Sequence, residues 1–175
     1  MRALARQKRS VTALGAWMAC AVLAAALVLL APARAEALTA PEQDYLSRIN
    51  ALRTSVGVQP LELDSTMTVL ADEHTREMVA MHDLHHTHDL KVGVGNAWTK
   101  LGENVGYGTT IELTWNAFVA SPSHYANLVD PAFTHIGIVV IQGDDGLYWT
   151  THRFLAAGRP TASTATAVRN RWVVQ

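Results

Sequence analysis

The sequence predicts an α+β domain with helices on both faces of a central antiparallel sheet, a three-layer α/β/α sandwich. Two observations support this architecture. Apolar residues recur at helical spacing between residues 41 and 128, and a continuous apolar run at 136–141 is followed by a turn and a second strand-like segment. A chain that places its helices first and a hairpin last covers the two faces of that hairpin with helices.

Residues 1–35 have the three parts of a secretory signal peptide: a basic opening, an apolar run over 11–31 and small residues at Ala33 and Ala35. We expect cleavage after Ala35, with Ala37 as the second choice. This leaves a folded domain over 36–156 and a loose tail over 157–175, without a transmembrane span. The alternative is an uncleaved membrane anchor, since a span needs about 20 apolar residues.

The segment after residue 35 is acidic and lacks cysteine. It carries nine basic and 15 acidic residues, a net charge of −6, and Cys20 lies in the expected signal. The negative charge argues against a nucleic-acid partner. We therefore expect a secreted monomer that is stabilised by its core and not by disulfides.

The expected elements follow in order. Pro41 and Gly57 bound a first helix, and a short extended stretch at 61–63 follows. Asp64 or Ser65 caps a second helix. Its apolar stripe consists of Met67, Leu70, His74, Met78 and Met81, with His74 expected as a core histidine.

The second half combines a loop, short helical segments and the hairpin. Residues 82–98 show no periodicity and predict a long loop. A short helix from Ile111 ends near Pro122, and one helical turn covers 123–128. Strands at 136–141 and 147–154 pair through a turn at 143–146.

Three short polar stretches concentrate the chemistry, at 82–88, 102–106 and 121–127. The first has four histidines in seven residues, and the second is Gly-Glu-Asn-Val-Gly. Each is turn-flanked and lies between elements, where functional residues are usually found.

Taken together, seven stretches resemble the CAP superfamily in its bacterial secreted branch. This superfamily includes cysteine-rich secretory proteins, antigen 5 and plant pathogenesis-related proteins. The resemblance covers about residues 41–156 and implies the same α/β/α sandwich, with a cleft. The matching stretches are Leu46-x-x-Ile-Asn50-x-x-Arg53, Pro60-Leu61-x-x-Asp64, Leu84-His-His86, Lys100-Leu-Gly-Glu-Asn104, Ser121-Pro-Ser-His-Tyr-Ala-Asn127, Asp130-Pro-x-Phe-Thr-His-Ile-Gly-Ile138 and the strand ending at Phe154.

The resemblance implies a cleft with histidines at His86 and His124 and a glutamate at Glu103. His85 is the adjacent competitor for the first position, and His88 matches less well. The second glutamate of the family pattern has no counterpart, because residues 118–121 read Phe-Val-Ala-Ser. Its absence weighs against a mechanism that needs two carboxylates.

Two further residues complete the expected ligand-binding cleft. Asn104 follows the glutamate in the Gly-Glu-Asn motif. His152 stands where bacterial relatives usually have glutamine after threonine, so an eighth histidine is expected to enter the cleft.

Several functions fit this set of residues. His86 and His124 could bind Zn²⁺ or another divalent cation, leaving positions open for water. The leading hypothesis is a secreted module that binds a metal, a small molecule, a lipid, a glycan, a peptide or another cell-envelope component. One alternative is a metal-dependent or acid–base peptidase or esterase using His86, Glu103 and His124. The other is a non-catalytic cell-surface protein in which Glu103 only braces a loop.

Overall fold

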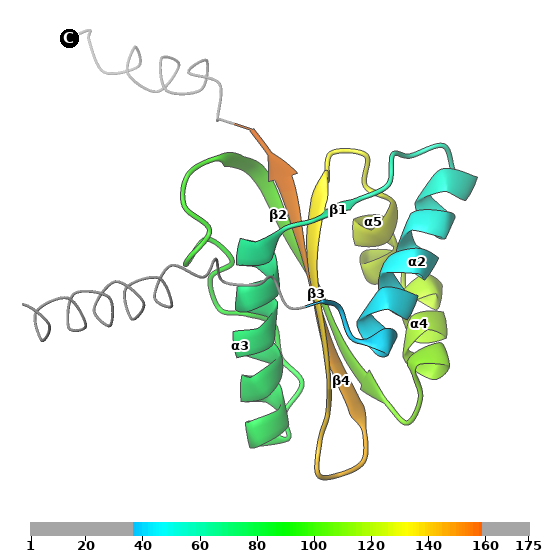
Figure 1. Ribbon diagram of the computed structural model, residues 1–175, viewed down its shortest axis with the longest axis vertical. Coiled ribbons are helices and arrows are strands. Elements are labelled where there is room, and N and C mark those ends of the chain that lie inside the picture. The colour runs from blue at the N-terminus through cyan, green and yellow to red at the C-terminus, as the bar shows by residue number, and fades with distance from the viewer. Residues whose placement is uncertain (1–36, 159–175) are drawn as a thin grey trace, which may run out of the picture. The chain divides into compact units, whose positions relative to one another are not determined.

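A computed structural model describes residues 37–158 of the chain. Four helices and four strands make up this domain (Figure 1). The helices are α2 (Ala40–Ser55), α3 (Ser65–Met81), α4 (Ile111–Ala120) and α5 (Pro122–Val129), and the strands are β1 (Glu62–Leu63), β2 (Trp98–Gly108), β3 (His135–Gln142) and β4 (Tyr148–Ala157).

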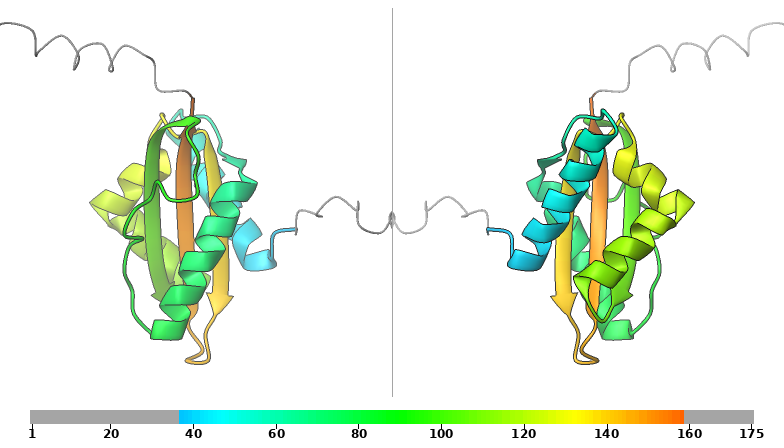
Figure 2. Two further views of the ribbon diagram at one scale, coloured as in Figure 1. Left: turned by 90° about the vertical axis from the view of Figure 1, so that its left-hand side faces the viewer. Right: turned by 90° about the vertical axis from the view of Figure 1, so that its right-hand side faces the viewer.

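The sheet has the order β1-β3-β4-β2 and lies between two helical layers. Helix α3 packs on one face, whereas α2, α4 and α5 cover the other (Figure 2). The β3–β4 hairpin and the β2–β4 pair are antiparallel, and the short β1 joins β3 in parallel. This α+β arrangement of helices around a central sheet confirms the predicted fold class. Within residues 37–158, no helix is long and apolar enough to cross a membrane.

Arg53 fastens the end of α2 to the rest of the larger helical layer. Its side chain is fully buried. Its guanidinium donates hydrogen bonds to four backbone carbonyls, those of Gln59, Leu128, Asp130 and Phe133, at 2.7–3.0 Å. One side chain thus satisfies carbonyls in the segment after α2, at the end of α5 and before β3, which explains why an arginine can be buried here.

Helix α3 approaches the sheet unusually closely at Gly137 of β3. A Cβ atom at Gly137 would lie 2.1 Å from the carbonyl carbon of Met67. Asp64, one of the two predicted caps, accepts a hydrogen bond from the Met67 amide. The predicted stripe is partly wrong, because Met81 is exposed. The face against the sheet carries small residues, which permit the close approach: Ala71 and Thr75 are buried beside Met67, His74 and Met78.

Strand β2 corrects the expectation that residues 102–106 are a short turn-flanked stretch between elements. They lie within an 11-residue edge strand. The glycines at the two ends of this stretch make room for aromatic rings. A Cβ at Gly102 would come within 2.7 Å of Phe133, and one at Gly106 within 2.8 Å of Phe118.

The predictions for the two ends of the chain lie largely outside the described residues. These are the signal peptide over 1–35 and the tail beyond 158. Ala157, which was assigned to that tail, is the last residue of β4. Its amide donates a hydrogen bond to the Thr134 hydroxyl.

Candidate functional site

Glu103 lies at the centre of the candidate site, on the edge strand β2. Its carboxylate is buried, with only 2% of the side chain exposed, and pairs with Arg153 on β4 at 3.1 Å. The two residues are direct partners in the β2–β4 register, so their side chains point to the same face of the sheet. The strand pairing therefore positions the ion pair.

The loop before β2 fills the remaining acceptor positions of Glu103. Oε1 accepts from Nδ1 of His86 at 2.8 Å and from the Thr87 amide at 3.0 Å. Oε2 accepts from the Thr87 hydroxyl at 2.6 Å and from Arg153. Burial alone would raise the pKa of Glu103, but the bonds from Thr87 and His86 outweigh it, so the pKa lies below the ordinary value. Glu103 is thus a carboxylate at neutral pH.

His86 points away from this buried pair into solvent. Its side chain is 59% exposed. Because the carboxylate of Glu103 can only accept, Nδ1 of His86 carries the proton that it donates. Within residues 37–158, no hydrogen bond occupies Nε2, the second ring nitrogen. A neutral His86 therefore offers an outward lone pair.

His124 reaches the same edge of the sheet from α5. Asn104, which is fully buried, donates to the backbone carbonyl of His124 at 3.1 Å and accepts from Asn127 at 2.9 Å. The imidazole packs edge-on against Phe118. Burial and the charge of nearby His86 lower the pKa of His124, so its ring is neutral at neutral pH. The structure thus places Asn104 as a brace behind His124.

His152 does not reach the surface. It is fully buried, with its ring against Tyr45 and Phe118. Within the described residues neither ring nitrogen has a hydrogen-bond partner. Burial, with a smaller effect from His124, lowers the pKa of His152 to about 3. In this conformation His152 belongs to the core beneath α2 and α4, and solvent does not reach it.

The other histidines of the loop lie apart from His86 and from one another's contacts. His85, the alternative to His86 as the first cleft histidine, faces α3, where its Nε2 lies 3.8 Å from Oε1 of Glu77. His82 ends α3 in a left-handed conformation, so it cannot share a helix face with His86. His88 is exposed.

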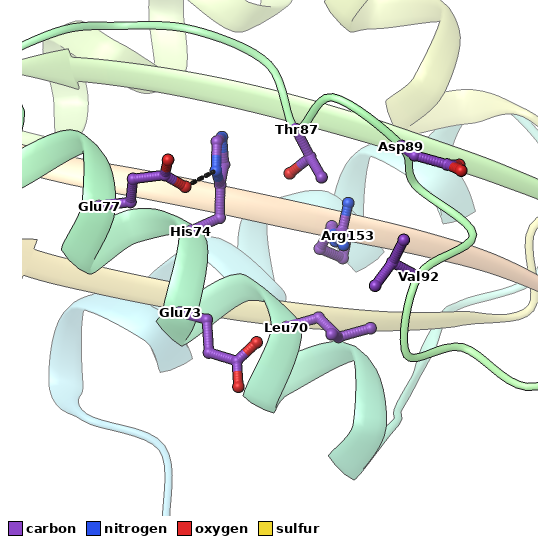
Figure 3. Close-up of a pocket in the computed structure, with 8 residues that line it drawn as sticks. All are labelled: Leu70, Glu73, His74, Glu77, Thr87, Asp89, Val92 and Arg153. Carbon is purple, nitrogen blue, oxygen red and sulfur yellow. Dashed lines mark ion pairs between the residues drawn. The ribbon is translucent and has the colours of Figure 1, made fainter.

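A pocket of about 160 Å³ opens between α3 and the loop (Figure 3). Thr87 and Arg153, both bonded to Glu103, form part of its wall. The sequence indicated neither residue. Thr87 is 16 positions from Glu103 and is placed by the path of the loop, whereas Arg153 is 50 positions away and is placed by the β2–β4 register. The other lining residues are Leu70, Glu73, His74, Glu77, Asp89 and Val92.

Comparison with known families and proteins finds a family and several proteins that are similar to this domain. A family model described as "Cysteine-rich secretory protein family" (CAP) matches residues 46–154. The uncharacterized protein YkwD of Bacillus subtilis (strain 168) is 28% identical over 120 residues. This match includes 64% of the chain but only 46% of YkwD, so the chain spans less than half of that relative.

Two solved bacterial structures share the fold. An outer surface protein from Borrelia burgdorferi matches with a TM-score of 0.62 at 20% identity, over 67% of this chain and 92% of that protein. An extracellular protein containing an SCP domain from Bacillus anthracis matches with a TM-score of 0.57 at 19% identity, over 71% of this chain and 45% of that protein.

Proposed function

The chain belongs to the cysteine-rich secretory protein (CAP) family, and we propose that it is an extracellular binding module that holds a divalent cation between His86 and His124. Glu103 is the positioning residue in this proposal. The ion would be Zn²⁺ or another divalent cation that prefers imidazole ligands. Its open coordination positions would accept a donor atom from a bound ligand. We expect that donor on a small molecule, a lipid or a cell-envelope component.

The hydrogen bond from His86 to Glu103 carries the proposal. Histidines that bind metals usually donate their second ring N–H to a carboxylate or a carbonyl, which fixes the tautomer and orients the free nitrogen. Glu103 is anionic, buried and held by Arg153, so it serves His86 in this way. The free Nε2 then projects into solvent.

The electrostatics of His124 also favour a cation. A histidine must be neutral to bind a metal. The lowered pKa of His124 keeps its ring neutral at pH values at which an ordinary histidine begins to protonate. His86 lies near enough to influence that pKa. Two imidazoles leave coordination positions for water or a ligand, as in sites that are not purely structural.

The same contacts argue against Glu103 as a catalytic base. A general base must reach a substrate proton directly or through one water. The carboxylate of Glu103 is 2% exposed and already accepts four hydrogen bonds. The geometry therefore favours binding over hydrolysis by this residue.

Zinc analysis and calorimetric titration of the protein, purified without a histidine tag, test the proposal. We expect His124→Ala and His86→Ala each to lose the same single equivalent of Zn²⁺ relative to the parent protein. Glu103→Gln should keep that equivalent with about 10–100-fold weaker affinity, the range for outer ligands. The site would be refuted if both histidine variants bound zinc with the stoichiometry and affinity of the parent protein.

His88→Ala provides the matched control. His88 is an exposed histidine of the same loop, two residues from His86. Its removal should leave zinc content and affinity unchanged. An equal loss in His88→Ala would mean that the loop binds zinc without a defined site.

A further inference from the structure

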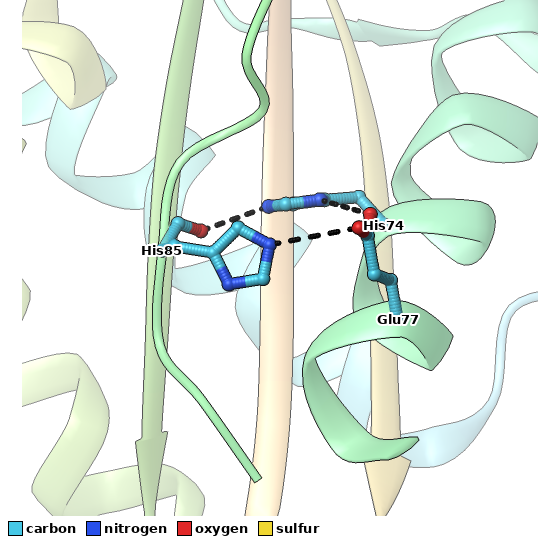
Figure 4. Close-up of side chains that lie close together, drawn as sticks. All are labelled: His74, Glu77 and His85. Atoms are coloured by element: carbon cyan, nitrogen blue, oxygen red, sulfur yellow. Dashed lines mark hydrogen bonds and ion pairs between the residues drawn. The ribbon is translucent and has the colours of Figure 1, made fainter. Parts of the chain in front are cut away.

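A second cluster of donor atoms lies on the α3 side of the loop. It consists of His74 and Glu77 on α3 and His85 in the loop (Figure 4). Each residue offers one ligand atom, and these three atoms lie within 4.8 Å of one another. We propose that His74, Glu77 and His85 form a second divalent-cation site, distinct from the His86–His124 pair, which ties the loop to α3.

Hydrogen bonds fix which nitrogen of each ring is free. Nε2 of His74 lies 2.9 Å from the carbonyl oxygen of His85 and must donate its proton there. Nδ1 of His85 likewise donates to the carbonyl oxygen of Asp83 at 3.2 Å. The lone pairs of neutral rings are therefore on Nδ1 of His74 and Nε2 of His85.

Both free nitrogens face the carboxylate of Glu77. Nδ1 of His74 lies 3.5 Å from Oε2, and Nε2 of His85 lies 3.8 Å from Oε1. Lone pairs and a carboxylate repel one another unless a cation or a proton lies between them. A zinc ion with bonds of about 2.0–2.2 Å would be compatible with these separations after small side-chain movements.

The surroundings suit a bound ion with open positions. His74 is 5% exposed, whereas Glu77 and His85 are 56% and 31% exposed, so one side of the cluster is rigid and the other meets solvent. His74 and Glu77 also line the pocket between α3 and the loop, which leaves room for water ligands. Two nitrogens and one carboxylate match Zn²⁺ and its first-row neighbours better than Ca²⁺ or Mg²⁺.

The test begins from His124→Ala, which lacks the first proposed site, so that the two sites can be judged separately. Zn²⁺ is titrated by calorimetry, and Co²⁺ serves as a spectroscopic probe. We expect one remaining equivalent and visible Co²⁺ bands of a low-coordinate site. Adding Glu77→Gln or His85→Ala should weaken zinc binding by about tenfold or more. His86→Ala, which changes an exposed residue, provides a second background.

Glu73→Gln is the matched control, because Glu73 lies one turn earlier on α3 and lines the same pocket outside the cluster. It should leave the zinc affinity unchanged. The second site would be overturned if neither the His124→Ala nor the His86→Ala protein bound zinc. It would also be overturned if adding Glu77→Gln or His85→Ala left the zinc affinity unchanged. A parent protein that binds only the equivalent dependent on Glu77 and His85 would support the second site and refute only the function proposed above.

Discussion

Glu103 and Arg153 face each other across β2 and β4 and form an ion pair in which neither side chain is more than 4% exposed. Burial lowers the pKa of Arg153, and the Glu103 carboxylate offsets part of that effect. The pair fixes one side of the carboxylate, and Thr87 and His86 fix the other. The orientation of an exposed imidazole thus depends on a buried salt bridge.

Removing the charge of Glu103 should destabilise the fold. Glu103→Gln leaves a buried arginine without its counter-ion, so we expect the free energy of unfolding to fall by about 3–5 kcal/mol. Urea unfolding at neutral pH with a chelator present measures this. Glu112→Gln is the control, since its exposed pair with Arg48 contributes about 1 kcal/mol or less. Equal losses in both variants would contradict the account.

His152 should make stability depend on pH. In the unfolded chain His152 binds a proton with the ordinary pKa of 6.5, whereas in the folded protein the pKa of His152 is about 3. Protons therefore favour unfolding between these values. Stability is retained above pH 6.5 and falls on acidification by up to about 1.4 kcal/mol per pH unit.

The conservative variant His152→Gln isolates this effect. It removes the titrating ring, so its unfolding free energy should fall less steeply between pH 6 and about 4 than that of the parent. Urea unfolding curves of both proteins at each pH give the slopes. Parallel slopes would show that His152 is not buried in its neutral form.

Arg53 should be essential for joining α2 to the segments around α5. Arg53→Met leaves four backbone carbonyls without their donor, two of them buried and two partly buried, and we expect a loss of about 3–5 kcal/mol in unfolding free energy. Arg76→Met, which removes an exposed pair with Asp72, should cost about 1 kcal/mol or less. A mild effect of Arg53→Met would show that solvent replaces its hydrogen bonds.

Gly137 should tolerate no side chain. A Cβ there would overlap the backbone of Met67, so Gly137→Ala must push α3 away from β3, at a cost of about 1–3 kcal/mol or more. Gly146→Ala is the comparison, because Gly146 has open space and only a left-handed backbone, with a cost of about 1–2 kcal/mol. Thermal unfolding ranks the two variants. A Gly137→Ala protein that is more stable than Gly146→Ala would contradict the close packing of α3 on β3.

The sequence predicted the helices and the β3–β4 hairpin because their apolar spacing differs clearly, and the fold and family expectations are confirmed. Strand β2 was missed because packing against Phe118 and Phe133 demands glycines that locally resemble a turn. The polar stretches did indicate His86 and Glu103, which the structure brings into contact. Of the two residues that support Glu103, Arg153 is placed by the register of β2 and β4 and Thr87 by the path of the loop before β2. Short motifs reveal neither.

The burial of His152 was also beyond sequence reasoning. A histidine after Thr151 was expected in the cleft, but strand alternation and the cover of Tyr45 and Phe118 enclose it. Similarly, His85 and His86 are neighbours in a loop without periodicity. Only the path of that loop sends His85 towards α3 and His86 towards Glu103.

A crystal structure of the protein grown with Zn²⁺, with an anomalous map recorded at the zinc edge, tests the central claim most directly. We predict an anomalous peak at about 2.0–2.1 Å from Nε2 of His86 and from a ring nitrogen of His124, with Glu103 bonded to His86 and not to the ion. The absence of a peak bridging these two rings, or a zinc ion bound directly by Glu103, would contradict it.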